Sequence, residues 1–363
     1  MQARIAGQRT ESAYRFSWRE VNSPEGLWRS PYEVIRRANF VLEAIERGDV
    51  ARSVAVDDMK GQALALRALC HFNLLLMYGQ PYLKDGGKSE GIPLVNTVLE
   101  AGALLVRSSV SDGYRMVKED LQEALRLTGE EKKDGYINRW AVKGLLARVS
   151  LYEGSWKEAY TSESVFDAAV SSKSSTNKEL LGYLASASGY NCLIATASFK
   201  ALLDEDGDDV RHGLLTKRGG YWFISKYPGR GGALSVNNVR IVRLSDLYLM
   251  AAESALKKGE RDQGKADAYL DAVRRRANPG VEKLVATEDL ILKERRKELL
   301  LEGYRFFDGM RLGKKLVREG GWHFLGGTDL VNPSWDDYRI VAPIPQAEMD
   351  VNPNFKGHQN KGY

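Results

Sequence analysis

The sequence predicts a mainly α-helical protein, built from paired helices with long irregular loops and little strand. Apolar residues recur every three or four positions over two blocks, residues 28–170 and 241–319, as on one face of an α-helix. The composition, 43% hydrophobic and 28% charged residues, is that of an ordinary folded protein. Residues 171–240 and 320–363 show no steady period. We therefore expect one domain over residues 1–363, with a variable loop-rich middle and an irregular C-terminal segment.

The N-terminal block, residues 28–170, predicts five helices. In the second of them Ala65, Leu69, Phe72 and Leu76 fall on one face, and Gly79 and Pro81 mark its end. In the third, Ser109 with Asp112 resembles a capping box. The expected helices are residues 28–47, 58–78, about 109–127, 138–152 and 155–170.

The C-terminal block, residues 241–319, begins with a helical period near Ile241. A second helix over about 262–277 ends at Pro279 and Gly280, and a third runs from Thr287 to Glu302. The stretches 147–159 and 251–259 resemble parts of tetratricopeptide helical hairpins. Stacked hairpins of this kind predict a superhelical scaffold.

Charge and cysteine content exclude several classes of function. The net charge of +5 arises from 53 basic and 48 acidic residues that are well mixed, so nucleic acid is not an expected partner. Two cysteines, Cys70 and Cys192, indicate neither a disulfide framework nor a cysteine metal site. The first residues lack the apolar core of a secretory signal, and no run of 18 apolar residues occurs, so we expect no membrane span.

Several strings carry a resemblance to a known family. Trp28, Tyr32 and the pair Ala38-Asn39 share one helix, and Tyr78-Gly79-Gln80-Pro81 is followed by Gly91-Ile92-Pro93. The longer strings are Arg243–Glu253, Glu294–Asp308 and Pro343–Tyr363. Together they resemble the SusD/RagB family of outer-membrane nutrient-binding lipoproteins, over roughly residues 28–160 and 209–363.

This resemblance implies a binding protein and not an enzyme. The family's tetratricopeptide-like scaffold docks against a SusC-like TonB-dependent transporter, and a surface built from loops binds a glycan or peptide ligand. The resemblance thus implies binding of oligosaccharide, or another polymeric nutrient, at the cell surface of the outer membrane and delivery to the transporter. Contact with the membrane would be through a lipid anchor, for which no signal or lipobox is visible in this chain.

A glycan site needs flat apolar faces and a few oriented hydrogen-bonding groups, so aromatic residues in irregular segments are the candidates for ligand contact. Trp222 could equally belong to a short strand whose alternate side chains face the core. Trp28, Trp140 and Trp156 lie within helical patterns, so we expect them in the core. The candidate ligand contacts are Trp222, Tyr221, Trp322, Trp335 and Trp18.

A dense set of charges follows residue 293 and allows two interpretations. Carboxylates four residues apart share a helix face and could serve acid–base catalysis. Interleaved arginines favour instead an ion-pair network that holds helices together. We predict this structural network, with no catalytic residues, for Glu294, Arg295, Glu298, Glu302, Arg305 and Asp308.

Metal and cofactor sites are not expected. The loop with Asp204, Asp206, Asp208 and Asp209 departs from an EF-hand, because Gly207 is misplaced and Leu215 stands where the bidentate glutamate belongs. The four histidines are scattered, and no nucleotide or serine-hydrolase motif occurs. Two alternatives to the binding protein stay open: a helical glycan-active hydrolase or lyase, and a tetratricopeptide-type protein-binding adaptor.

Overall fold

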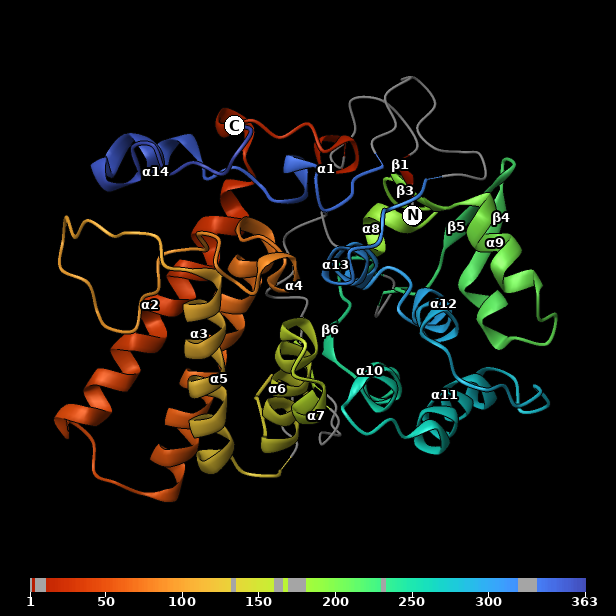
Figure 1. The fold of residues 1–363 in the computed structure, drawn as a ribbon, viewed down its shortest axis with the longest axis horizontal. Helices are drawn as coiled ribbons and strands as arrows, with labels where there is room; N and C mark the ends of the chain where they lie inside the picture. The colour runs from red at the N-terminus through yellow and green to blue at the C-terminus, as the bar shows by residue number, and fades with distance from the viewer. Residues whose placement is uncertain are drawn as a thin grey trace. The chain divides into compact units, whose positions relative to one another are not determined.

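The computed structural model describes residues 2–3, 11–131, 135–159, 166–168, 181–229, 233–318 and 332–363. The protein is mainly helical with little strand, as predicted (Figure 1). Its contacts divide the chain into two compact units, each made of separate segments. Unit 1 contains Met1–Ser17, Asp167–Asp308 and Leu316–Asn332; unit 2 contains Trp18–Phe166, Gly309–Lys315 and Pro333–Tyr363.

Unit 2 is an array of antiparallel helices. The long helices α2, α3, α5 and α6 pack each against the next in chain order (Figure 1). The bounds are α2 (Glu25–Arg47), α3 (Val54–Tyr78), α4 (Tyr82–Asp85), α5 (Val110–Leu127), α6 (Arg139–Glu153), α7 (Trp156–Ala159) and α14 (Gln346–Val351). The predicted cap at Ser109 is present, since its Oγ accepts the Asp112 N–H at 3.0 Å. Gly48 ends α2 with a left-handed φ of +80°, which a residue without Cβ adopts at low cost.

The core of unit 2 is rich in aromatic residues and contains a buried ion pair. The Phe72 ring meets Tyr114 and Tyr152 edge-on, with centroids 5.8 and 5.7 Å away. Arg67 of α3 donates to both carboxylate oxygens of Asp120 in α5, at 2.8 and 2.7 Å. These contacts fix α3 against α5, because both partners of the ion pair are buried and geometrically matched.

The segment 333–363 completes unit 2, although it is remote from the helices in sequence. The Ala342 N–H donates to the carbonyl of Met77 at 2.8 Å. The Asn360 amide donates to the Tyr78 carbonyl at 2.9 Å, and its oxygen accepts from Arg107 Nη2 at 2.7 Å. The last turn of α3 is therefore satisfied by backbone and side chains of this distant segment.

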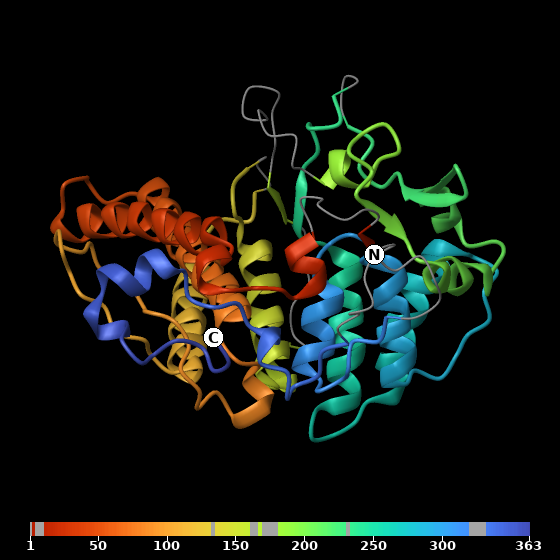
Figure 2. The same ribbon diagram turned by 90° about the horizontal axis from the view of Figure 1, so that it is seen from above.

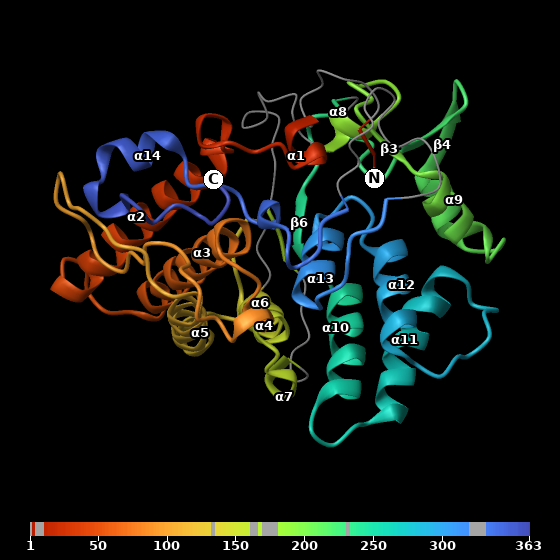
Figure 3. The ribbon, with the colours of Figure 1, turned by 45° about the horizontal axis from the view of Figure 1, so that its top comes forward.

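Unit 1 combines three neighbouring helices with a small sheet. In Figures 2 and 3, α10 (Leu244–Lys257), α11 (Gln263–Ala277) and α12 (Glu288–Glu298) lie side by side, in agreement with their contacts. The antiparallel sheet has the order β1-β3-β5-β4. Its strands are β1 (Gln2–Ala3), β3 (Leu193–Ala195), β4 (Leu215–Arg218) and β5 (Tyr221–Ile224). The remaining elements include α1 (Glu11–Arg15), α8 (Leu181–Ala185), α9 (Ala197–Asp204), η2 (Val210–Leu214), β2 (Phe166–Ala168), β6 (Val239–Val242) and α13 (Tyr304–Arg311).

Some helix predictions were wrong at their ends. The helix expected over 155–170 is described only as Trp156–Ala159, and Phe166–Ala168 is a strand. Ile241 lies in β6, and the helix after it starts at Leu244. The helix expected to reach Glu302 ends at Glu298, because Leu301 adopts a positive φ of 63° that interrupts the helical backbone. The middle segment also holds strands β3 to β5 rather than loops alone.

Two tryptophans depart from the expected core positions. Trp28 is buried, as predicted, with 2% of its surface exposed. Trp140 is 37% exposed and stacks under the ammonium of Lys143, whose Nζ lies 4.6 Å from the ring centroid. Trp156 is only half-buried. None of the described helices is both long and apolar enough for a membrane span.

Candidate functional site

Tyr221 and Trp222 lie on β5, which confirms the strand interpretation of this segment. Trp222 pairs with Lys217 of β4 and packs at the edge of a hydrophobic cluster around Phe199 and Leu203. The ammonium groups of Lys200 and Lys217 lie 5.0 and 5.7 Å from its ring centroid. The ring is half-buried and serves the core on one side. Contact of Tyr221 or Trp222 with a ligand stays a prediction.

Trp335 is held firmly within unit 2. Its indole N–H donates to the carbonyl of Met310, and its own carbonyl accepts from the Lys84 ammonium. A Cβ on Gly313 would lie 3.3 Å from the ring, so this glycine (φ +66°) lets the backbone lie close to the indole. The indole N–H and part of the ring of Trp335 are therefore already engaged.

Among the candidate ligand contacts that lie in the described residues, Trp18 has the fewest polar and aromatic partners. It is half-buried and lies in the irregular segment between α1 and η1 (Glu20–Asn22) in the sequence. Among the described residues, the indole N–H has no hydrogen-bond acceptor and the ring has no aromatic or cationic partner. A partly exposed indole with a free donor has the two features that sugar binding requires. Trp322, the remaining candidate, lies outside the described residues.

A groove of about 600 Å³ lies on unit 2, and none of the aromatic residues predicted to contact a ligand is among its lining residues. Helix α2, the loop 93–105 and the segment from α14 to Phe355 form it, and Figure 3 shows these parts side by side. Its rim carries exposed aliphatic side chains, with Leu99, Leu104 and Val351 at 41%, 53% and 72% exposure. Trp28 and Tyr32 line its floor.

The side chains of Asn39 and Tyr32 hold the loop that forms one wall of this groove by hydrogen bonds to its carbonyl groups. Asn39 of α2 donates to the carbonyls of Val95 and Thr97 at 3.3 and 2.8 Å. The Tyr32 hydroxyl donates to the carbonyl of Pro93 at 2.8 Å. The Trp28, Tyr32 and Asn39 spacing was thus visible in the sequence, but its role is to fix a distant loop. Burial raises the pKa of Glu348 in the groove, against the effect of a hydrogen bond with the Trp28 side chain.

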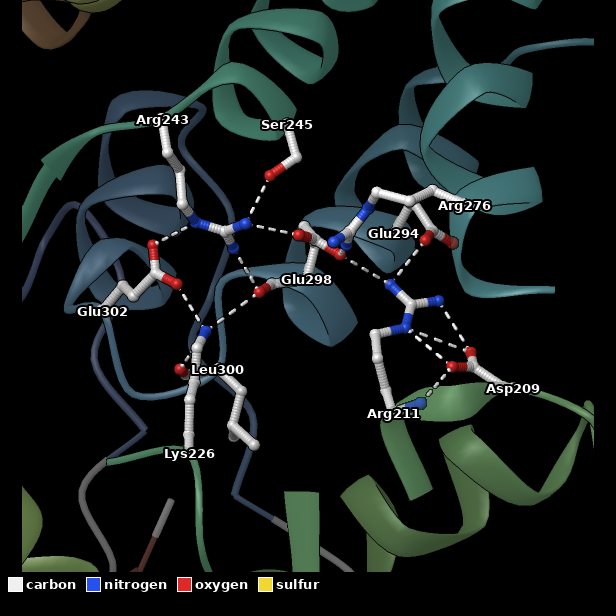
Figure 4. Close-up of polar contacts among 10 residues, drawn as sticks. All are labelled: Asp209, Arg211, Lys226, Arg243, Ser245, Arg276, Glu294, Glu298, Leu300 and Glu302. Atoms are coloured by element: carbon white, nitrogen blue, oxygen red, sulfur yellow. Dashed lines mark hydrogen bonds and ion pairs between the residues drawn. The ribbon is translucent and has the colours of Figure 1, made fainter. Parts of the chain in front are cut away.

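The charged residues of α12 meet a set of arginines in the interior of unit 1 (Figure 4). Glu298, 3% exposed, accepts from Arg211 at 3.2 Å, from Arg276 at 2.5 Å and from Arg243. Arg243 Nε also donates to Glu302 at 2.9 Å, so it bridges the two carboxylates across the end of α12. Glu302 receives the Lys226 ammonium as well, which further donates to the carbonyls of Glu298 and Leu300.

The same pattern extends to the other end of the set. Arg211 donates to both oxygens of Asp209, at 2.7 to 3.2 Å, and to Glu294 at 2.7 Å. Arg295 joins Asp246 and Asp308, both at 2.8 Å. Arg305, expected to take part, is exposed; it lies within ion-pair distance of no acidic group in the described ranges, but the charge of Asp308 acts on it electrostatically.

The electrostatics of Glu298 oppose a role for this carboxylate as a proton donor. Burial alone raises the pKa of Glu298, but the charges of Arg243 and Arg276 and the hydrogen bonds it accepts lower it to about 2. Burial lowers the pKa of Lys226 to about 8, despite its contact with Glu302. A general acid near neutral pH needs a raised pKa instead. These ion pairs instead connect α10, α12 and the 209–226 segment and hold them together.

The acidic loop 204–209 is also committed to structure. Asp209 pairs with Arg211, and the Asp206 carboxylate accepts from the Asn278 amide at 2.8 Å. Lys200 pairs with Asp204. Over the part of the chain that the structure describes, no three histidine, cysteine or acidic side chains gather as metal ligands.

Two family models match the chain. Residues 216–363 match the model described as SusD family, and residues 5–151 match one described as starch-binding associating with outer membrane. The starch-binding protein SusD of Bacteroides thetaiotaomicron is 31% identical over 126 residues, or 35% of this chain and only 22% of SusD. A SusD-like protein of Bacteroides ovatus is 23% identical over 401 aligned positions, covering 88% of this chain and 70% of that protein.

Solved structures agree over nearly the whole chain. A SusD superfamily protein from Bacteroides vulgatus has a TM-score of 0.90 and 32% identity, covering 97% of this chain and 88% of that one. Another from Bacteroides thetaiotaomicron has a TM-score of 0.89 and 33% identity, covering 97% and 90%. With two family models and relatives of this identity and coverage, the chain belongs to the SusD family.

Proposed function

We propose that this protein binds oligosaccharide, or another polymeric nutrient, at the outer-membrane surface and passes it to a SusC-like TonB-dependent transporter. The observation that carries the proposal is family membership. One matching family model is described as starch-binding and associating with outer membrane, and the similar protein SusD is named starch-binding. The protein has no catalytic role in this proposal, since the buried carboxylates of α12 are engaged by arginines.

Trp18 is the ligand contact that the surroundings favour. Its partly exposed ring offers an apolar face for the C–H groups of a sugar, and among the described residues no acceptor occupies its N–H, which can donate to a sugar hydroxyl. Trp335 has already used its N–H, and Trp222 supports the core of unit 1. Trp335, Trp222 and Tyr221 thus rank behind Trp18 as contacts.

The test is calorimetric titration of starch-derived maltooligosaccharides and a panel of other soluble glycans. Trp18→Ala is expected to weaken binding by about 1 kcal/mol or more, as loss of an aromatic anchor does, with an unchanged melting temperature. Trp140→Ala is the matched control, because Trp140 is also partly exposed but lies on the regular helix α6. If the protein bound no glycan in the panel, the proposal that its nutrient is an oligosaccharide would be contradicted. If Trp18→Ala and Trp140→Ala bound the glycan equally well, Trp18 would not be the ligand contact.

The groove on unit 2 supports the part of the proposal that concerns the SusC-like transporter. Its rim exposes the aliphatic side chains Leu99, Leu104 and Val351, and exposed apolar patches of this kind mark interaction sites. In this proposal the groove faces the transporter. Leu104→Asp with Val351→Asp should abolish co-purification with a TonB-dependent transporter co-expressed from the same locus while glycan binding stays. Intact co-purification would exclude the groove as the contact.

A further inference from the structure

Unit 1 contains a second cavity, of about 340 Å³, that the glycan proposal does not use and that borders the ion-pair network at Asp209, Arg211 and Glu294. Its walls come from the end of α11, the loop 278–290, the segment 205–211 and one face of α12. The α12 residues that line it are Leu290, Lys293, Glu294 and Lys297, which follow each other at intervals of three, one and three and so share one helix face.

Lys297 is the unusual member of this lining. It is only 7% exposed, and among the described residues its ammonium has neither a hydrogen-bond acceptor nor an ion-pair partner. Lysines with so little exposed surface are nearly always paired. Lys297 therefore presents unused donors to the cavity.

The neighbouring carboxylates are bonded to Arg211 and not to Lys297. Asp209 is the acidic group on which Lys297 acts electrostatically, yet both Asp209 oxygens accept from Arg211. Glu294 also accepts from Arg211, at 2.7 Å. Lys293, by contrast, pairs at 2.5 Å with Glu205 at the rim. Lys297 is thus the lining lysine that the described structure leaves for a ligand.

The rest of the lining defines the other properties of that ligand. Val281, Leu284 and Leu290 provide an apolar wall, suited to ring C–H groups. Asp206 and Glu282 supply carboxylate acceptors for hydroxyl groups. The cavity is lined by five acidic residues and four basic ones, so it disfavours a dianion such as phosphate more strongly than a ligand with one negative charge, which Lys297 can pair with locally. Its volume is at the small end for ligand pockets, which run from about 300 to 1,000 Å³.

We infer that this cavity binds a single sugar acid, a hexuronate, whose carboxylate pairs with Lys297 and whose hydroxyls donate to the acidic rim. The site is separate from Trp18 and goes beyond the proposed glycan capture. The protein would then bind an acidic monosaccharide, of the kind that hydrolysis or lyase cleavage of a uronic-acid polymer releases.

The test is calorimetric titration of glucuronate and galacturonate, with glucose, galactose and acetate as probes that lack either the charge or the ring. Hexuronate should bind the parent protein, and Lys297→Met should weaken it by about tenfold or more, since a charged hydrogen bond is lost. Lys293→Met is the matched control, because Lys293 lines the same cavity but is already paired with Glu205. It should change affinity by less than about threefold.

Two further variants keep the inference testable if Lys297→Met does not fold. Lys297→Arg keeps the positive charge and should retain binding, whereas Leu284→Trp, at a 37% exposed wall position, should obstruct the cavity and lower affinity with Lys297 intact. No hexuronate binding by the parent, equal binding of glucose or acetate, or affinity unchanged in both Lys297→Met and Leu284→Trp would overturn the inference. Trp18→Ala should leave hexuronate binding unchanged, which separates this result from the glycan test.

Discussion

Replacing Glu298 by glutamine removes one negative charge from the centre of the ion-pair network in unit 1 while keeping the size of the side chain. Glu298 is 3% exposed, and its oxygens accept from Arg211, Arg243 and Arg276. In glutamine one oxygen becomes an NH₂ group, which donates hydrogen bonds and cannot accept from an arginine. At least one guanidinium therefore faces another donor in a buried site.

The magnitude follows from the partners that each arginine keeps. Removing one member of a buried ion pair costs roughly 3 to 5 kcal/mol. Arg211 retains Asp209 and Glu294, Arg243 retains Glu302, and the Arg276 side chain is 58% exposed. We therefore expect the lower end, about 3 kcal/mol. With about 2 to 4 °C per kcal/mol for a unit of this size, the melting temperature should fall by roughly 6 to 12 °C.

The assay is thermal unfolding followed by circular dichroism, at pH 7 and at several lower pH values. Glu288→Gln is the control, since Glu288 lies in the first turn of the same helix and its ion pair with Lys257 is partly exposed (35% and 21%). Such pairs contribute about 1 kcal/mol at most, so this variant should melt close to the parent.

The pH series gives a second, independent criterion. The Glu298 pKa falls from 4.5 to about 2 on folding, so its stabilisation is present above pH 4.5 and is lost as pH falls through 2. The gap between parent and Glu298→Gln should thus narrow across that range. A variant that melts with the parent at pH 7, or a gap that does not change with pH, would refute the structural role of Glu298.

Three further predictions concern stability and can be checked by urea unfolding. Trp28→Ala should cost about 3 to 5 kcal/mol, because the ring is 2% exposed and meets Tyr78 edge-on at 4.8 Å; a smaller loss would mean that the groove floor is not core. Burial lowers the pKa of His71 from 6.5 to about 4, so the unfolded state takes up a proton that the folded state does not, and stability should fall as pH drops from 6.5 to 4. An NMR titration of His71 near pH 6.5 would contradict this. Gly48→Ala should cost about 1 kcal/mol at its left-handed φ of +80°, whereas Gly26→Ala, in open space within α2, should not destabilise.

The sequence was informative where local chemistry decides the structure. The helices α2, α3, α5, α6 and α11 were predicted because apolar spacing, capping side chains such as Ser109 and stop signals such as Pro279 agree with one another. The strands β2, β3, β4 and β6 were missed, and β5 was given only as an alternative, because runs of three or four residues are too short for an alternation to be distinguished from chance.

The end of α12 shows a different limit of sequence reasoning. Glu294, Glu298 and Glu302 are spaced four residues apart, which predicts one continuous helix face. The backbone leaves the helix after Glu298, yet Glu302 returns to the same cluster because Arg243 and Lys226 bind it there. The spacing therefore predicted correctly that Glu302 lies near Glu298, but it predicted the wrong backbone conformation. Ion pairs with Arg243 and Lys226, and not the helical period, bring Glu302 into the cluster.

The two cavities were invisible in the sequence for a physical reason. Each is assembled from segments far apart along the chain, such as Trp28, Leu104 and Val351 in the groove, and no local period connects them. Lys297 appeared as one more charge in a helix that is rich in charges. Only its burial and its lack of a partner among the described residues distinguish it from Lys293.

The discontinuous make-up of unit 2 has a consequence for how the chain is synthesised. Residues 18–166 emerge from the ribosome long before residues 333–363, which bind the last turn of α3 through Ala342 and Asn360. Until then the carbonyls of Met77 and Tyr78 lack these partners, and the groove lacks the wall that Val351 and Phe355 supply. A partner that recognises the groove would therefore bind only chains whose translation has passed residue 355, and would disregard nascent or prematurely terminated ones.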